Sequence, residues 1–294
     1  MIRTIDPKEI PVPELHGLLL GSISPRPIAF ASTVDKAGNI NLSPFSFFNV
    51  FSANPPVMIF SPARRVRGNT TKHTLDNAEA TKEVVINVVS YEMVYQMSLA
   101  SSEYPQGVNE FTKSGFTEIA SETIQPPRVK ESPVSFECKV NDIIHLGKEG
   151  GAGNLIICEV QRIHINEDIL DENGKIDPNK IDTVARMGGS WYCRASGDAL
   201  FQIPKPLTSI GIGYDSIPED IRNSSILTGN ELGQLGNIEA LPSLAAIKKV
   251  KDLPEVNKIL SSETKVEERL HQLAKGMLAK GQTEHAWAIL MCNK

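Results

Sequence analysis

The chain has 294 residues, of which 40% are hydrophobic, so it can bury a sizeable core as one large domain or as one domain with a smaller one. Its formal net charge is −5, with acidic and basic residues interspersed. This pattern disfavours nucleic acid and membrane surfaces as partners, and any anion site must be local.

No apolar stretch of the sequence reaches the ~20 residues that span a bilayer, and residues 1–6 lack the apolar core of a secretory signal. We therefore expect a cytoplasmic protein. The cysteines are far apart and form no Cys-x-x-Cys pair, which disfavours a zinc ribbon or a redox pair. They are Cys138, Cys158, Cys193 and Cys292. We expect reduced thiols and no metal site.

The N-terminal segment 10–23 carries leucines at helical spacing and predicts a short amphipathic helix that covers one end of the following domain. Pro25-Arg26-Pro27 comes next, and the two prolines fix the backbone so that Arg26 projects from a stiff support. Two interpretations of Arg26 stay open: a solvated arginine where a strand begins, and a contact to a bound ligand.

Two apolar strands, predicted at 28–34 and 55–60, flank a segment unusually rich in hydroxyls, amides and aromatic rings. In that segment, strand alternation places one set of side chains on a common face: Asn41, Ser43, Phe45, Phe47 and Asn49. Buried polar groups need partners, and a polar, planar ligand can supply them. The rings of Phe45 and Phe48 are expected to belong to the ordinary core.

Cations and hydroxyls follow the second strand, at Ser61, Arg64, Arg65, Arg67, Lys72 and Thr74. Residues 70–82 predict a helix, capped by Thr70 or Thr71, with Lys72 in its first turn. A lysine there opposes the helix dipole unless an anion neutralises it, which indicates a bound phosphate. The competing interpretation of Lys72 is a solvated surface lysine. A ring site followed by a phosphate site is the layout of a mononucleotide such as FMN.

Further strands are predicted at 84–89, 134–146 and 154–165, and a helix at 91–100. The glycine-rich link 147–153 joins two strands and lacks the Gly-Lys-Ser/Thr ending of a phosphate loop, so it predicts a hairpin loop.

The C-terminal third has a different character. Residues 201–206 predict a linker, and residues 238–250, 254–260 and 266–291 show helical spacing with charged faces. We find no nucleophile, metal cluster or basic recognition helix there. Three roles stay open for this region: packing on the first domain, extending a dimer interface, or binding a partner protein.

Five pieces of the sequence, in order, together resemble the flavin reductase-like family: Ser24–Ala29, Gly38–Phe48, Pro55-Pro56, Lys72-His73-Thr74 and Arg186–Gly189. The similarity extends from about Ile10 to about Ala195. It implies a mainly β fold, a split β-barrel that binds FMN, with peripheral helices and an added C-terminal α-helical extension. We therefore expect an FMN-binding domain at 1–203 and the helical extension at 204–294.

The resemblance implies that Asn41, Ser43 and Phe47 lie against the isoalloxazine and ribityl chain of FMN. The other expected cofactor contacts are Arg26, Ser46, Asn49, Ser61, Arg64, Lys72, Thr74, Arg186 and Tyr192. His73 stands where the family commonly has an acid, so we assign it no direct role. No catalytic side chain is expected, because the cofactor carries the chemistry.

The expected activity is an NAD(P)H-dependent flavin reductase that moves a hydride from NADH or NADPH to the flavin and passes electrons to a downstream acceptor. A second hypothesis is a flavin-carrying electron-transfer protein reduced by a protein partner, and no Gly-x-Gly-x-x-Gly fingerprint decides between them. A third is a barrel that has lost flavin and scaffolds the helical region. Family members complete the flavin site with a second subunit, so a homodimer is expected.

Overall fold

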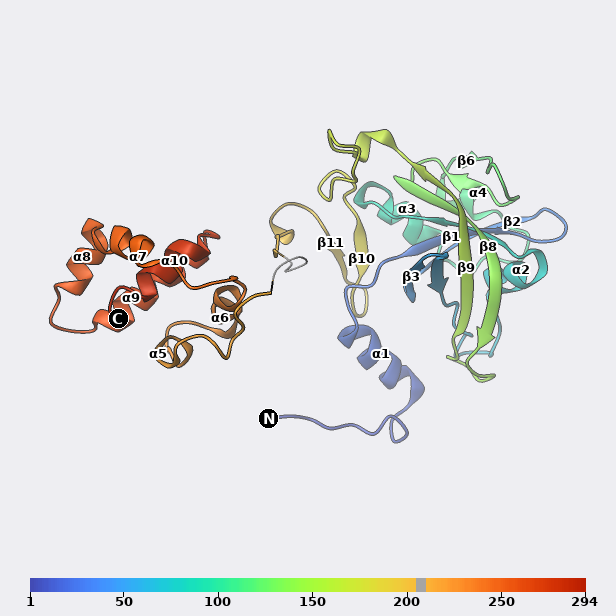
Figure 1. The fold of residues 1–294 in the computed structure, drawn as a ribbon. Coiled ribbons are helices and arrows are strands. Elements are labelled where there is room, and N and C mark those ends of the chain that lie inside the picture. The colour runs from blue at the N-terminus through green and yellow to red at the C-terminus, as the bar shows by residue number, and fades with distance from the viewer. Residues whose placement is uncertain (205–209) are drawn as a thin grey trace. The chain divides into compact units, whose positions relative to one another are not determined.

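A computed structural model describes residues 1–204 and 210–294 (Figure 1). The chain divides into two compact units, Met1–Phe201 and Gln202–Lys294, which we call the first and second units. Residues 205 and 206 of the predicted linker lie outside the described residues.

The first unit is built on an antiparallel sheet of seven strands in the order β2-β1-β5-β8-β9-β4-β3. Both edge strands come from one stretch of chain, because only Ser46 and Phe47 separate β2 from β3. The sheet must therefore curl until its two edges meet at these residues. The strands are β1 (Ala29–Val34), β2 (Ile40–Phe45), β3 (Phe48–Ala53), β4 (Pro56–Phe60), β5 (Glu83–Asn87), β8 (Val134–His145) and β9 (Asn154–Ile165).

The meeting of the two edges forms a seam rather than a closed barrel. In the described part of the chain no hydrogen-bonded ladder joins β2 to β3. The prediction of one alternating strand from Asn41 to Asn49 is therefore wrong. The chain bends at Ser46 and Phe47 because it passes there from one edge of the sheet to the other, and the N–H of Ser61 fixes the bend by donating to the Phe47 carbonyl at 2.8 Å.

The sheet buries apolar side chains on both faces. On one face, α2 (His73–Thr81) packs its Leu75 and Ala78 into a core that includes Phe60 and Ile86. On the other face, α3 (Val94–Leu99) and α4 (Glu110–Ser114) pack against Phe30. A strand buried on both faces carries a continuous apolar run, as Val84 to Ile86 of β5 does, and the strand predicted there is confirmed.

Helix α1 (Val12–Ser22) is confirmed as a helix, but none of its residues is buried. Its apolar side chains either line a cavity described below or stay exposed. Two short ribbons complete the first unit: β6 (Glu118–Ile119) with β7 (Arg128–Val129), and β10 (Val184–Arg186) with β11 (Tyr192–Arg194).

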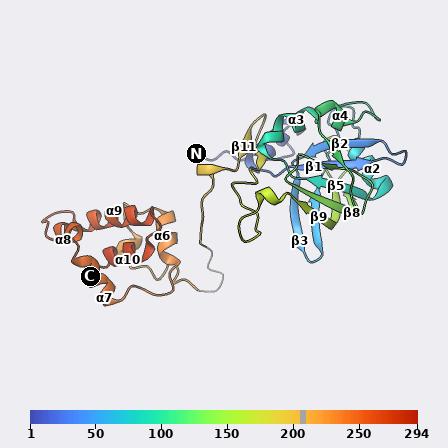
Figure 2. The ribbon, with the colours of Figure 1, turned by 90° about the horizontal axis from the view of Figure 1, so that it is seen from above.

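The second unit is helical and has its own core around Trp287, which is fully buried and whose indole N–H donates to the Leu235 carbonyl at 2.9 Å. Figures 1 and 2 show α6, α9 and α10 side by side. The helices are α5 (Glu219–Arg222), α6 (Gly229–Gly236), α7 (Leu244–Lys251), α8 (Pro254–Leu260), α9 (Val266–Leu278) and α10 (Thr283–Leu290).

The predicted helix at 254–260 is confirmed, the one predicted at 238–250 begins only at Leu244, and the run at 266–291 is two helices. They are separated near Gly281, whose φ of +72° suits glycine. The described helices include none with the length and apolar character required to cross a membrane.

Glu137 is a fully buried carboxylate on β8. It accepts hydrogen bonds from the N–H of Glu122 at 2.8 Å, from the hydroxyl of Thr123 at 2.6 Å and from the N–H of Thr123 at 2.7 Å, and its Oε1 lies 2.7 Å from His164 Nε2. Burial raises the pKa of Glu137, but these hydrogen bonds outweigh burial and lower the pKa from 4.5 to about 2.

Because the folded-state pKa is depressed, Glu137 stabilises the first unit above its unfolded pKa of about 4.5. We expect a contribution of about 3 kcal/mol that is lost as the pH falls through the folded pKa of about 2. Hydrogen exchange of β8 amides should show Glu137→Gln less protected than wild type at pH 6, with the difference shrinking between pH 4.5 and 2. A difference independent of pH would contradict this account.

Candidate functional site

Two adjoining cavities lie in the first unit, one at the seam and one between α1 and the loop that precedes α2. The first, which we call the seam cavity, has a volume of about 440 Å³, and the second, the basic cavity, about 520 Å³. Both volumes are in the range of small-molecule sites, roughly 300–1,000 Å³. His16, Ala63 and Lys72 line both cavities, so the two are neighbours.

The seam cavity brings together residues that are far apart in the sequence. Six of the predicted cofactor contacts line it: Ser43, Ser46, Phe47, Ser61, Lys72 and Arg186. His16, Leu20 and Ser101 also line it, and no pattern around them in the sequence marked them. The ring of Phe47 meets the imidazole of His16 edge to face, with ring centroids 6.3 Å apart.

Ser61 holds β9 against the seam. Its buried hydroxyl accepts the N–H of Asn154 at 3.0 Å. The neighbouring Gly153 leaves no room for a side chain, since a Cβ there would stand 2.8 Å from the Ser61 hydroxyl oxygen. The Ser61 side chain therefore makes a tight contact with the main chain at the start of β9.

Arg26 is an anchor for main-chain carbonyls. Its buried guanidinium donates to the carbonyls of Leu20 and Ile23 at the C-terminal end of α1 and to that of Met187 at 2.9 Å. Burial, followed by the charge of Arg186, lowers the pKa of Arg26. The solvated interpretation of Arg26 is wrong, and these contacts are structural. Its predicted contact to a cofactor stays a prediction.

The side chains of Asn41 and Thr74 are hydrogen-bonded to each other. The Thr74 hydroxyl donates to Asn41 Oδ1 at 2.6 Å, and Asn41 Nδ2 donates to Glu110 Oε1 at 3.0 Å. The second oxygen of Glu110 accepts the N–H of Leu42 at 2.9 Å, and burial raises the pKa of Glu110. This network ties β2 to α2 and α4, and neither Asn41 nor Thr74 lines the two cavities.

The remaining predicted contacts lie around the cavities. Asn49 is exposed on β3 and accepts the N–H of Val50, whereas Arg64 lines the basic cavity with its guanidinium bonded to Asn69 at 2.7 Å. Tyr192 lies beneath the guanidinium of Arg186, 4.5 Å from its ring centroid, and so supports a residue that lines the seam cavity.

The N-terminus of α2 adjoins both cavities, because its N-cap residue, Lys72, lines each of them. The helix begins at His73, and Lys72 is the N-cap residue with no side-chain cap, so the predicted cap by Thr70 or Thr71 is wrong. Within the described residues, no hydrogen bond links the N–H of His73 or Thr74 to the protein. Such a terminus beside a lysine favours an anion.

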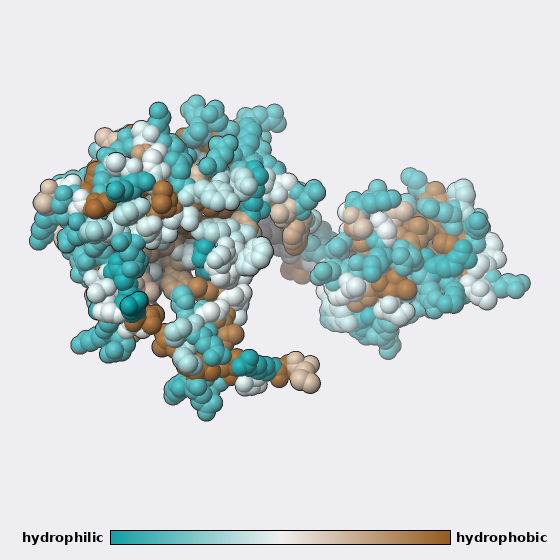
Figure 3. Space-filling view, turned by 180° about the vertical axis from the view of Figure 1, so that it is seen from behind, coloured by the Kyte–Doolittle hydropathy of each residue, from teal (hydrophilic) through white to brown (hydrophobic). Residues whose placement is uncertain are grey.

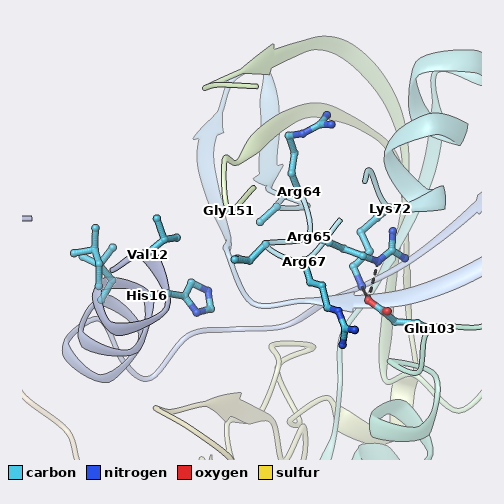
Figure 4. Close-up of a pocket in the computed structure, with 12 residues that line it drawn as sticks. Val12, His16, Arg64, Arg65, Arg67, Lys72, Glu103 and Gly151 are labelled. Atoms are coloured by element: carbon cyan, nitrogen blue, oxygen red, sulfur yellow. Dashed lines mark hydrogen bonds and ion pairs between the residues drawn. The ribbon is translucent and has the colours of Figure 1, made fainter. Parts of the chain in front are cut away.

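The basic cavity has an apolar wall from α1 and a charged wall from the loop before α2 (Figure 4). The cationic residues that line it are Arg64, Arg65, Arg67 and Lys72. Glu103 faces two of them: its Oε1 lies 2.7 Å from Arg65 Nε and 3.6 Å from Lys72 Nζ. No pattern around Glu103 in the sequence marks this contact, which joins residues 38 positions apart.

Comparison with known proteins places this geometry in a family. The protein-family model described as "Flavin reductase like domain" matches residues 20–180. An uncharacterized protein of Aquifex aeolicus is 39% identical over 196 residues, which cover 67% of this chain and 97% of that protein.

Two solved structures are similar to this chain. Nitrilotriacetate monooxygenase component B from Bacillus cereus is 31% identical with a TM-score of 0.64, covering 69% of this chain and 99% of that one. A protein of Shewanella frigidimarina with a split barrel domain is 27% identical with a TM-score of 0.57, covering 67% and 95%. The family match ends before the second unit. The chain belongs to the flavin reductase-like family, with its family domain in the first unit.

Proposed function

We propose that the first unit binds FMN and acts as an oxidoreductase that takes a hydride equivalent from NADH or NADPH and passes electrons to a downstream acceptor. The observation that carries this proposal is the junction at Lys72. There, a cavity lined by an aromatic ring and hydroxyls opens beside a cationic cavity and the N-terminus of α2. FMN has the matching order of parts, a planar ring system and a terminal phosphate.

The residues of the seam cavity fit a polar, planar ring. Phe47 offers an apolar face, and the hydroxyls of Ser43 and Ser46 can each donate and accept hydrogen bonds. Lys72 and the first N–H groups of α2 would hold the phosphate. When bound, FMN supplies the capacity to accept a hydride equivalent, which no side chain has.

The chain's own contribution is binding and electrostatics. Hydroxyl donors at Ser43 and Ser46, together with the positive charge of Arg186, would stabilise the negative charge that reduction places on the ring system. The hydrogen bond from Arg186 to the Gly189 carbonyl at 2.8 Å and its stacking on Tyr192 restrict the guanidinium, so little reorganisation would accompany the reaction.

The curled sheet supports the finer description of the first unit as a split barrel. Its edges meet at Ser46 and Phe47 without a ladder between β2 and β3 in the described chain. An opening of this kind gives a planar nicotinamide access to one face of a ring held in the seam cavity.

Anaerobic stopped-flow absorbance tests the proposed activity. Protein loaded with FMN should lose its flavin absorbance on mixing with NADH or NADPH, and Lys82→Ala, at the far end of α2, should behave as wild type. Bleaching by dithionite but by neither nicotinamide would favour reduction by a protein donor instead. Protein that takes up no FMN would refute the proposal and favour a barrel that only scaffolds the second unit.

We also propose that the protein is a homodimer that buries α1. Leu18 of this helix is 39% exposed and Ile23, its C-cap residue, is 67% exposed, and Figure 3 shows hydrophobic surface over the segment that contains the helix. Val12, Leu15 and Leu19 of α1 wall the basic cavity, so a second copy packed on α1 would close that cavity from solvent.

Light scattering should give a mass of twice 32.2 kDa for the full chain. Leu18→Glu should shift the mass toward a single copy, because it places a charge in the proposed interface without altering a residue that lines either cavity. A single-copy mass for the wild type across a wide concentration range would rule out the proposed dimer.

A further inference from the structure

Glu103 occupies the place to which the cations of the basic cavity would draw a ligand's anion. One of its carboxylate oxygens, Oε1, faces both Arg65 Nε and Lys72 Nζ, at 2.7 Å and 3.6 Å. Figure 4 shows this carboxylate between the two side chains. Lys72 is also the residue at which the basic cavity and the seam cavity adjoin. The protein thus supplies its own anion at the junction.

The two sides of this contact differ in how firmly they are held. Arg65 is only 21% exposed, and its guanidinium also donates to the Thr70 hydroxyl at 2.9 Å and to the Thr71 carbonyl. Glu103 is 63% exposed, and among the described residues its side chain makes polar contacts with Arg65 and Lys72 alone. The arginine is therefore fixed by the loop, and the carboxylate is the partner that can move away.

The ion pairs of Glu103 are weak enough for a phosphate to replace its carboxylate. Exposed ion pairs contribute roughly 0.2–1 kcal/mol, since solvent screens them. A phosphate monoester carries a charge of about −1.5 to −2 near neutral pH, more than the single charge of a carboxylate. The oxygens of a phosphate can also bond the first N–H groups of α2, which Glu103 does not contact. A phosphate can therefore displace Glu103, but must break its ion pairs to do so.

We infer that Glu103 is an internal competitor for the phosphate of the bound flavin and that it lowers the affinity for FMN. This inference rests on the proposed function. Binding of a flavin that carries a phosphate includes the free-energy cost of displacing Glu103. Binding of riboflavin, which lacks the phosphate, does not.

The test is an equilibrium titration of FMN and of riboflavin, followed by quenching of flavin fluorescence, into wild type, Glu103→Gln and Glu172→Gln. Glu172 is exposed on a loop of the same unit and makes no ion pair with any described residue, so its variant controls for the loss of one negative charge. We expect Glu103→Gln to bind FMN about two- to fivefold more tightly than wild type. Riboflavin affinity should be unchanged in all three proteins, and Glu172→Gln should match wild type for both ligands.

The dependence of FMN affinity on salt concentration gives a second readout, which would not differ between wild type and Glu103→Gln if Glu103 only supported the structure. In Glu103→Gln the cations lose their negatively charged internal partner, so FMN affinity should fall more steeply between low and high salt than in wild type. Unchanged or weaker FMN binding by Glu103→Gln, or tighter binding of riboflavin to the same extent as FMN, would overturn the inference. Failure of wild type to bind either flavin would instead refute the proposed function.

Discussion

The first unit depends on one constraint of chain connectivity: two residues, Ser46 and Phe47, join the two edge strands of a seven-stranded sheet. A sheet whose edges are joined in this way must curl, and in the described chain no ladder pairs the two edges. The seam that results exposes hydroxyls and an aromatic ring at a point where a closed barrel would have a ladder. The cavity exists because the chain crosses from one edge to the other there.

Charge is arranged around this seam in two ways. Arg26 bonds only within the protein: its guanidinium donates hydrogen bonds to carbonyls at the end of α1 and to the carbonyl of Met187. This use of a buried cation satisfies polar groups that a helix end otherwise leaves unpaired. Arg65 and Lys72 face a carboxylate that is mostly exposed, and the uncapped start of α2 adds N–H donors beside them. Arg65, Lys72 and these N–H groups can bind a ligand without disrupting the fold, whereas Arg26 cannot.

The sequence predicted the strands and helices well where one pattern dominates, as in the β-branched run of β5 and the leucine-rich spacing of α9. It did not predict the bend at Ser46, since polar and aromatic alternation continues through it. Helix α6 was missed because its glycines lower helix propensity, although a capping box of Thr228 and Glu231 begins it. Contacts between residues far apart in the sequence could not be predicted from local patterns. Asn41 and Thr74 form a hydrogen bond across 33 positions, and Glu103 bonds to Arg65 across 38.

The most direct test of the central claim is the position of FMN in a crystal of the protein grown with it. The account predicts the three fused rings in the seam cavity beside Phe47, with the phosphate within hydrogen-bond distance of Lys72 and of the N–H of His73. Rings bound elsewhere, or a seam cavity filled by the protein's own side chains, would contradict it.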